Sequence, residues 1–103
     1  MSQSTRYFLI KLIPPRPTFA LDMSADERKV MQDHVAYWTD LANKRTAIVF
    51  GPVLDPNGVW GVSIVETEDE SATLALMTGD PVIKSGLNFA FEIYPMGPAI
   101  VRG

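Results

Sequence analysis

The sequence predicts an α+β fold in which a four-stranded antiparallel sheet carries two helices on one face. Patterns typical of strands lie near both ends of the chain, at residues 5–13 and 88–94, and a hairpin pattern occupies residues 46–66. Helical patterns separate these segments, so the order is βαββαβ, which is that of the ferredoxin-like motif. The chain has 103 residues, enough for one core and too few for two, so we expect a single domain over residues 1–103.

The first strand and the segment after it differ in composition. Residues 5–13 (TRYFLIKLI) are rich in aromatic and branched side chains and stop at a pair of prolines. Because Pro14, Pro15 and Pro17 favour extended backbone, we expect an ordered arm or long loop over about residues 14–23. The arm also contains a P-x-x-P pattern, but this pattern is so permissive that a stiff connector is the simpler interpretation.

A capping box predicts where the first helix begins. Glu27 follows Ser24 by three residues, so the serine hydroxyl can accept the Glu27 amide hydrogen while the Glu27 carboxylate accepts that of Ser24. We expect this helix to run to about Asn43, which leaves Lys44 and Arg45 at its negative end.

A hairpin and a second helix follow. Strand patterns at residues 46–54 and 59–66 flank the turn sequence Asp55-Pro56-Asn57-Gly58, and together they predict an antiparallel hairpin. The acidic segment after the hairpin leads into SATLALMTG, which predicts a short helix ending near Gly79.

The last part of the chain returns to the sheet. Asp80-Pro81 interrupts the second helix, and residues 82–87 are expected to form a turn or a brief helical piece. The fourth strand follows at residues 88–94, and residues from about 95 to 103 form a tail that contains Gly and Pro.

The second face of the sheet is too apolar to be left in water. Alternation places Ala47 and Val49 on one face and Ile48 and Phe50 on the other, so apolar side chains occur on both faces. An apolar patch of this size indicates a binding surface. We therefore expect a homodimer in which two sheets pack face to face. The mixed positions enclosed between the sheets are expected to include Ser63, Glu92 and Tyr94.

Composition excludes several classes of function. The balance of 9 Lys/Arg against 12 Asp/Glu gives a net charge of −3, which argues against nucleic acid and acidic membranes as partners. The absence of cysteine excludes disulfides, thiolate metal sites and cysteine nucleophiles. The first apolar run is short and ends at prolines, unlike a signal peptide or a membrane span, so we expect a cytoplasmic protein.

The single histidine lies within the apolar stripe of the first helix. At about 100° per residue, His34 falls inside that stripe, whereas Asp33 and Asp40 point elsewhere. An imidazole that faces a core needs partners for its ring nitrogens. The partner we favour is Asp80, which would fix the His34 tautomer and leave the other nitrogen as a general acid or base near neutral pH. Two simpler interpretations stay open, namely a satisfied core histidine and an ordinary Asp-Pro cap.

Other candidate residues rest on weaker patterns. Tyr37, Trp60 and Ser63 could line a substrate cleft, whereas Trp38 lies inside the apolar stripe and is expected in the core. A single histidine, without cysteine or a nearby second ligand, is a weak indication of haem or metal binding, so no cofactor is expected.

Three stretches of the sequence together resemble the YCII-related (YciI-like) family. They are the helical segment DHVAYW at residues 33–38, the hairpin segment FGPVLDPNG at 50–58, and GDPVIKSGL at 79–87. The resemblance implies a dimeric α+β barrel of ferredoxin-like subunits, with His34 and Asp80 at the positions of a proposed active-site pair. One relative that acts in aromatic degradation is a dehydrochlorinase, and the wider superfamily includes muconolactone isomerases.

The residues and the resemblance lead to two hypotheses of function. The preferred hypothesis is a small cofactor-independent enzyme in which His34 and Asp80 carry out general acid/base proton transfer, of the lyase or isomerase type, on a small cyclic or aromatic metabolite. The alternative is a non-catalytic dimeric module that binds a small molecule in the same cleft.

Overall fold

The computed structural model describes residues 6–103, which form four strands and four helices. Thr5, which begins the predicted first strand, lies outside the described residues. In chain order the elements are β1 (Arg6–Ile13), α1 (Phe19–Asp22), α2 (Ala25–Asn43), β2 (Ala47–Val53), β3 (Trp60–Thr67), α3 (Glu70–Gly79), α4 (Pro81–Lys84) and β4 (Ala90–Pro95).

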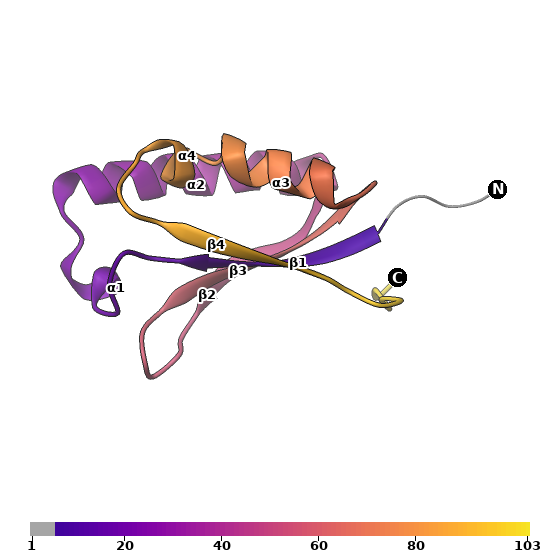
Figure 1. Ribbon diagram of the computed structural model, residues 1–103, viewed down its shortest axis with the longest axis horizontal. Coiled ribbons are helices and arrows are strands. Elements are labelled where there is room, and N and C mark those ends of the chain that lie inside the picture. The colour runs from indigo at the N-terminus through magenta and orange to yellow at the C-terminus, as the bar shows by residue number, and fades with distance from the viewer. Residues whose placement is uncertain (1–5) are drawn as a thin grey trace.

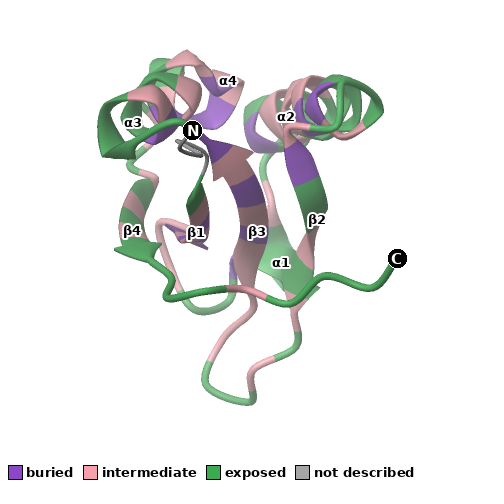
Figure 2. Ribbon diagram, turned by 90° about the vertical axis from the view of Figure 1, so that its right-hand side faces the viewer, coloured by how far each residue is buried: buried purple, intermediate pink, exposed green. Residues whose placement is uncertain are grey.

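The strands form one antiparallel sheet in the order β2-β3-β1-β4. Figure 1 shows α2, α3 and α4 as a layer on one side of this sheet, with α1 apart from that layer. Figure 2 shows α2 lying beside α3 and α4 above the strands. The predicted α+β fold, with helices on one face of an antiparallel sheet, is confirmed. Residues 96–103 continue past β4 without a helix or a strand.

The helix α2 begins and ends as its sequence predicts. The Ser24 hydroxyl accepts the Glu27 amide at 3.1 Å, and the Glu27 carboxylate accepts the Ser24 amide at 2.8 Å. These two bonds complete the capping box and satisfy two amides that would otherwise lack partners at a helix start. The helix then runs to Asn43, and Arg45 follows with a φ of 68° as the chain turns toward β2.

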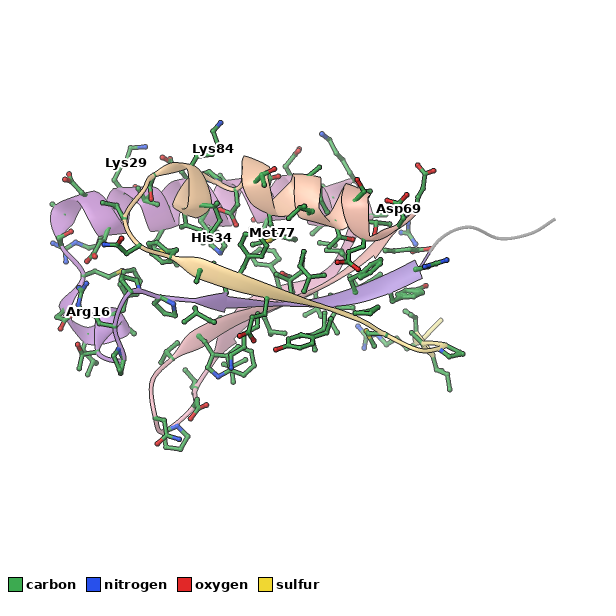
Figure 3. All side chains as sticks on the ribbon, in the orientation of Figure 1. Arg16, Lys29, His34, Asp69, Met77 and Lys84 are labelled. Carbon is green, nitrogen blue, oxygen red and sulfur yellow. The ribbon has the colours of Figure 1, made fainter. Side chains whose placement is uncertain are left out.

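The core lies between the helix layer and the sheet. Alternate residues of β1 point toward the helices, because side chains alternate between the two faces of a strand. Each large apolar side chain buried there contributes roughly 1.5–3 kcal/mol relative to exposure. In Figure 3, His34 and Met77 lie on the sheet side of the helix layer, whereas Lys29 and Lys84 lie on its outer side. The buried core consists of Phe8, Ile10, Leu12, Trp38, Leu41, Ala47, Val65, Met77 and Val82.

A β-bulge in β2 corrects the alternation expected there. Ala47 pairs with Val65 but Val49 pairs with the preceding residue of β3, Ile64, so the register shifts at Ile48. An extra residue in one strand reverses which side chains face inward beyond it. Ala47 and Phe50 therefore both face the helices, and Val49 lies on the opposite face, 53% exposed. The prediction that Ala47 and Val49 share a face is wrong.

The expected position of Ser63 is also wrong. Ser63 pairs with Ile10 of β1, and it is buried beneath the helices. Glu92 and Tyr94 do lie on the other face, since they pair with Lys11 and Leu9, and the Tyr94 hydroxyl donates a hydrogen bond to Glu92. Ser63 therefore belongs to the helix-covered side of the sheet and not to a surface between two sheets.

The Pro-rich arm is ordered and contains the short helix α1, which the sequence did not predict. Arg16 donates two hydrogen bonds to the Glu27 carboxylate, at 2.8 and 2.9 Å, and two to Asp22, one to its carboxylate at 2.8 Å and one to its carbonyl at 2.9 Å. The Phe19 ring packs edge-on against Phe89, with the ring centroids 5.2 Å apart. These contacts join the arm to the start of α2 and to the segment before β4.

Candidate active site

Asp80 lies at the bend where α3 ends and α4 begins. Its amide donates to the Met77 carbonyl at the end of α3, and its carboxylate accepts the Val82 amide at 3.1 Å at the start of α4. Pro81 occupies the first position of α4, where the missing N–H leaves no bond unmade. The side chain is thereby turned inward and is fully buried. Asp80 is thus the helix cap that an Asp-Pro bend suggests, but the cap uses only part of its carboxylate.

The Asp80 carboxylate also accepts a hydrogen bond from His34 on α2. Nδ1 of His34 lies 2.9 Å from Oδ2 and 3.0 Å from Oδ1 of Asp80. An ionised carboxylate can only accept, so the proton of a neutral imidazole lies on Nδ1 and the lone pair on Nε2. The structure thus brings together the two residues that the sequence analysis paired.

Trp38 is a further member of this cluster that the sequence analysis missed. Its indole Nε1 donates to Oδ2 of Asp80 at 2.7 Å, and its side chain is almost completely buried. Trp38 follows His34 by four residues, so both side chains lie on the same face of α2. That spacing was a signal in the sequence, but an apolar stripe does not show that an indole N–H meets a carboxylate.

The cluster accounts for a buried charge without a permanent cation. His34, Trp38 and the Val82 amide are the donors to Asp80, and no Lys or Arg of residues 6–103 bonds to it. A buried carboxylate is costly unless hydrogen bonds replace its hydration. The imidazole is therefore the one partner of Asp80 whose charge can change with a proton.

His34 also borders a cavity of about 240 Å³ between α2, the arm and the β2–β3 hairpin. The walls are mostly aromatic and aliphatic, and His34 and Ser63 add an imidazole and a hydroxyl. Sites for small organic molecules are typically concave and apolar with a few placed polar groups. Prominent members of the apolar wall are Leu12, Phe19, Met31, Trp38, Phe50 and Phe89.

The predicted cleft residues do not all reach this cavity. Ser63 borders it, whereas Tyr37 does not, because its hydroxyl donates to the Leu76 carbonyl at 2.6 Å between α2 and α3. Burial, and secondly the negative charge of Asp80, raise the pKa of the Tyr37 hydroxyl above its ordinary 10.0. Tyr37 therefore acts as a neutral link between two helices, and the prediction that it lines the cleft is wrong.

Trp60 borders the cavity at the hairpin, but its indole has partners elsewhere. The indole N–H donates to Asp55 at 3.1 Å, and the Lys11 ammonium lies 4.7 Å from the ring centroid. Strand register places Lys11 and Trp60 on the face of the sheet that the helices leave uncovered. Trp60 thus forms part of the cavity wall, and Asp55 and Lys11 hold its indole in place.

A metal centre finds no support in the described part of the chain. Residues 6–103 contain no group of three or more His, Cys, Asp or Glu side chains that could hold a metal ion. The chemistry that the site offers is that of an oriented imidazole beside an apolar space.

A family model, the YCII-related domain, matches residues 8–97. The chain belongs to the YCII-related family. The match begins within β1 and ends just beyond β4, so it includes both His34 and Asp80.

A solved structure has the same fold as this YCII-related chain. It is described as the NE2512 protein of unknown function from Nitrosomonas europaea, with 15% sequence identity and a TM-score of 0.53, and the similarity covers 99% of each chain. No protein with a curated description matches the sequence. Among the described helices, none has the length and apolar character needed to cross a membrane.

Proposed function

We propose that this YCII-related protein is a small cofactor-independent enzyme that transfers a proton on a small cyclic or aromatic molecule, as a lyase or an isomerase does. The observation that carries the proposal is the contact of 2.9 Å between His34 Nδ1 and the buried Asp80, with the same imidazole bordering an apolar cavity. Nε2 is the ring nitrogen that Asp80 does not engage, so it is the atom assigned to the substrate.

In the proposed reaction, the lone pair of His34 Nε2 takes a proton from an acidic C–H of the bound molecule. The electron pair of that C–H bond stays on the substrate as a carbanion or enolate, and the imidazole becomes an imidazolium. Asp80 stabilises this positive charge and keeps the ring in position. An isomerase returns the proton to another carbon, whereas a lyase uses the electron pair to expel a leaving group, which departs with the proton.

The cavity supports a small and largely apolar substrate. An apolar cavity of about 150 Å³ is large enough to take up benzene, and this one is about 240 Å³. Its partly aromatic walls suit a flat ring. The wall alone is equally suited to binding without reaction, so the experiment must separate the enzyme from the non-catalytic binding module.

Proton exchange in D₂O makes this separation without knowledge of the complete reaction. Small cyclic ketones and phenols are incubated with the protein, and ¹H NMR follows the loss of each C–H signal as deuterium replaces it. The wild type is expected to exchange a bound compound about 10²–10⁴ times faster than His34→Gln. Binding without accelerated exchange favours the non-catalytic module, and equal exchange by the His34→Gln variant contradicts the role of His34.

We also propose that the protein is a homodimer whose two uncovered sheet faces pack together. This face carries Lys11 and Glu92 among apolar side chains, and Val49 and Tyr94 are 53% and 49% exposed. An apolar face of this kind is typical of an interface. The apolar members of the proposed interface are Leu9, Val49, Val62, Ile64 and Tyr94.

Sedimentation equilibrium tests the dimer. Ile64 pairs with Leu9 and Val49 in the middle of the uncovered face, so Ile64→Arg is expected to give monomers. Lys84→Glu, on the outer side of the helix layer (Figure 3), is the control for a change of charge outside the interface and should leave the dimer intact. A wild-type protein that sediments as a monomer at micromolar concentration contradicts the proposal.

A further inference from the structure

Ser63 is a buried polar side chain that has no hydrogen-bond partner among residues 6–103. Its relative exposure is 7%, it lies on the helix-covered face of β3, and it borders the cavity. Within residues 6–103 its hydroxyl makes no hydrogen bond, although every fully enclosed side-chain N or O atom there has a partner. The Ser63 hydroxyl is therefore accessible, and the space it opens to is the cavity. A hydroxyl that borders an apolar cavity can both donate and accept a hydrogen bond, so this group is suited to a molecule bound there.

The charges around the cavity favour an uncharged ligand. No Lys, Arg, Asp or Glu of the described chain lines it, and His34 is its one titratable wall residue. The nearby cations are engaged elsewhere, since Arg16 is bound to Asp22 and Glu27, and Lys11 lies over Trp60. An anionic ligand would lose its hydration and find no permanent positive charge in return. The carboxylate of Asp80 behind His34 adds to that penalty.

The two polar wall groups come from different layers of the fold. His34 projects from α2 toward the sheet, and Ser63 projects from β3 toward the helices. A ring placed between the two layers can contact the imidazole while an oxygen substituent reaches the serine hydroxyl. The remaining contacts of such a ring are apolar, which matches the cavity wall.

We infer that the cavity selects a neutral ring compound with a single oxygen substituent, and that Ser63 binds this oxygen. The inference deepens the proposed function by naming the class of substrate. Only the reaction at His34 rests on the proposed function, because the choice of ligand is a property of binding. Ser63 is thus assigned as the residue that distinguishes an oxygen-substituted ring from a plain hydrocarbon, and the absence of a cation rejects carboxylates.

Three probes of one ring size test this selection: phenol, toluene and benzoate, at pH 8. His34 is the only histidine in the sequence, so its single imidazole Cε1–H signal in ¹H NMR reports binding in the cavity. For the wild type, phenol is expected to bind at least about ten times more tightly than benzoate. Ser63→Ala is expected to weaken phenol binding about three- to tenfold, the range of one hydrogen bond, and to leave toluene binding unchanged.

Ser71→Ala on the exposed side of α3 is the matched control and should alter none of the three affinities. The melting temperature of Ser63→Ala verifies that this variant is folded. The inference is overturned if benzoate binds as tightly as phenol, if Ser63→Ala weakens phenol and toluene equally, or if none of the three binds. Because these measurements do not depend on turnover, they can fail while His34-dependent exchange persists, and they can succeed while exchange is absent.

Discussion

Glu27 and Asp80 are two carboxylates of similar construction and different use. Each caps a helix, and each accepts hydrogen bonds from one backbone amide and from side chains outside its own helix. The side-chain partner of Glu27 is Arg16, a permanent cation at the edge of the molecule. Asp80 is enclosed, and its titratable partner is His34.

This difference distinguishes a structural contact, Arg16–Glu27, from a pair that can take part in proton transfer, His34–Asp80. A guanidinium stays charged throughout the physiological range, so the Arg16–Glu27 contact holds the arm to α2 without a change of charge. An imidazole can gain and lose a proton near neutral pH, and a buried carboxylate responds to that change. Replacing each carboxylate by its amide, in Asp80→Asn and Glu27→Gln, is therefore the sharpest way to compare the two contacts.

The largest effect is expected for Asp80→Asn. The amide nitrogen must face an N–H donor, either that of Trp38 or that of Val82, whichever oxygen it replaces. We expect a loss of about 1–3 kcal/mol in the free energy of unfolding, measured by urea denaturation. The substitution removes the negative charge that stabilises the imidazolium and one of the two oxygens that face His34 Nδ1, so it should lower the exchange rate by about 10²–10⁴. An exchange rate within about twofold of the wild type in a folded variant contradicts the role given to Asp80.

A smaller effect on exchange is expected for Trp38→Phe. Phenylalanine keeps an aromatic ring in the core but removes the N–H that donates to Asp80. The carboxylate keeps His34 and the Val82 amide, so we expect about a tenfold loss of exchange and a loss of about 1.5–3 kcal/mol in stability, the range for a bond to a charged group. Exchange and urea denaturation again provide the measurements. A variant that loses stability but no exchange would show that Trp38 serves the fold alone.

Glu27→Gln should affect the arm and spare the chemistry. The substituted amide keeps one acceptor oxygen for Ser24 and Arg16, but the negative charge is gone, so α1 is held less firmly. We expect faster chymotrypsin cleavage after Phe19, which the native arm buries, and an exchange rate within about threefold of the wild type. Asp33→Asn, which breaks the exposed Lys29 pair on the same helix, is the control and should leave cleavage unchanged.

The smallest effect is a response of the arm to acid. Hydrogen bonds from Arg16 are the main reason that the pKa of the Glu27 carboxyl is lowered from 4.5 to about 2. A carboxyl whose pKa is lowered by folding stabilises the fold above its unfolded pKa and loses that contribution as the pH falls. The stabilisation from the Arg16–Glu27 contact is therefore fully present above pH 4.5 and is lost as the pH falls through about 2. The Ser24 amide signal in NMR reports the folded state, so it should shift with a midpoint at about pH 2 in the wild type and stay constant in Glu27→Gln.

The sequence predicted those parts of the fold that depend on local chemistry. The capping box at Ser24 predicted the start of α2, the basic pair Lys44 and Arg45 accompanied its predicted end, and the Asp-Pro bend marked the end of α3. The His34–Asp80 contact followed from two such local facts, a helical angle and a bend, together with the cost of an unpaired imidazole in a core. What that contact does chemically stays a prediction.

Other parts depend on contacts that no local pattern contains. The bulge at Ile48 depends on how β2 meets β3, and one extra residue reverses the alternation from which a face is deduced. The position of Ser63 depends on its pairing with Ile10, and the Trp38 bond depends on where the bend brings Asp80. The cavity itself requires the arm, the helix and the hairpin at once.

The bend at Asp80 has a consequence for the evolution of new activities. One residue there ends α3, starts α4 and anchors His34, so a substitution changes folding and reactivity together. Among the described residues, those of the hairpin and arm that line the cavity do not hydrogen-bond to His34 or Asp80, so they can vary while the imidazole keeps its orientation. Libraries that seek new specificities should therefore diversify wall positions such as Val59 and Met23 and leave the Gly79–Pro81 segment untouched.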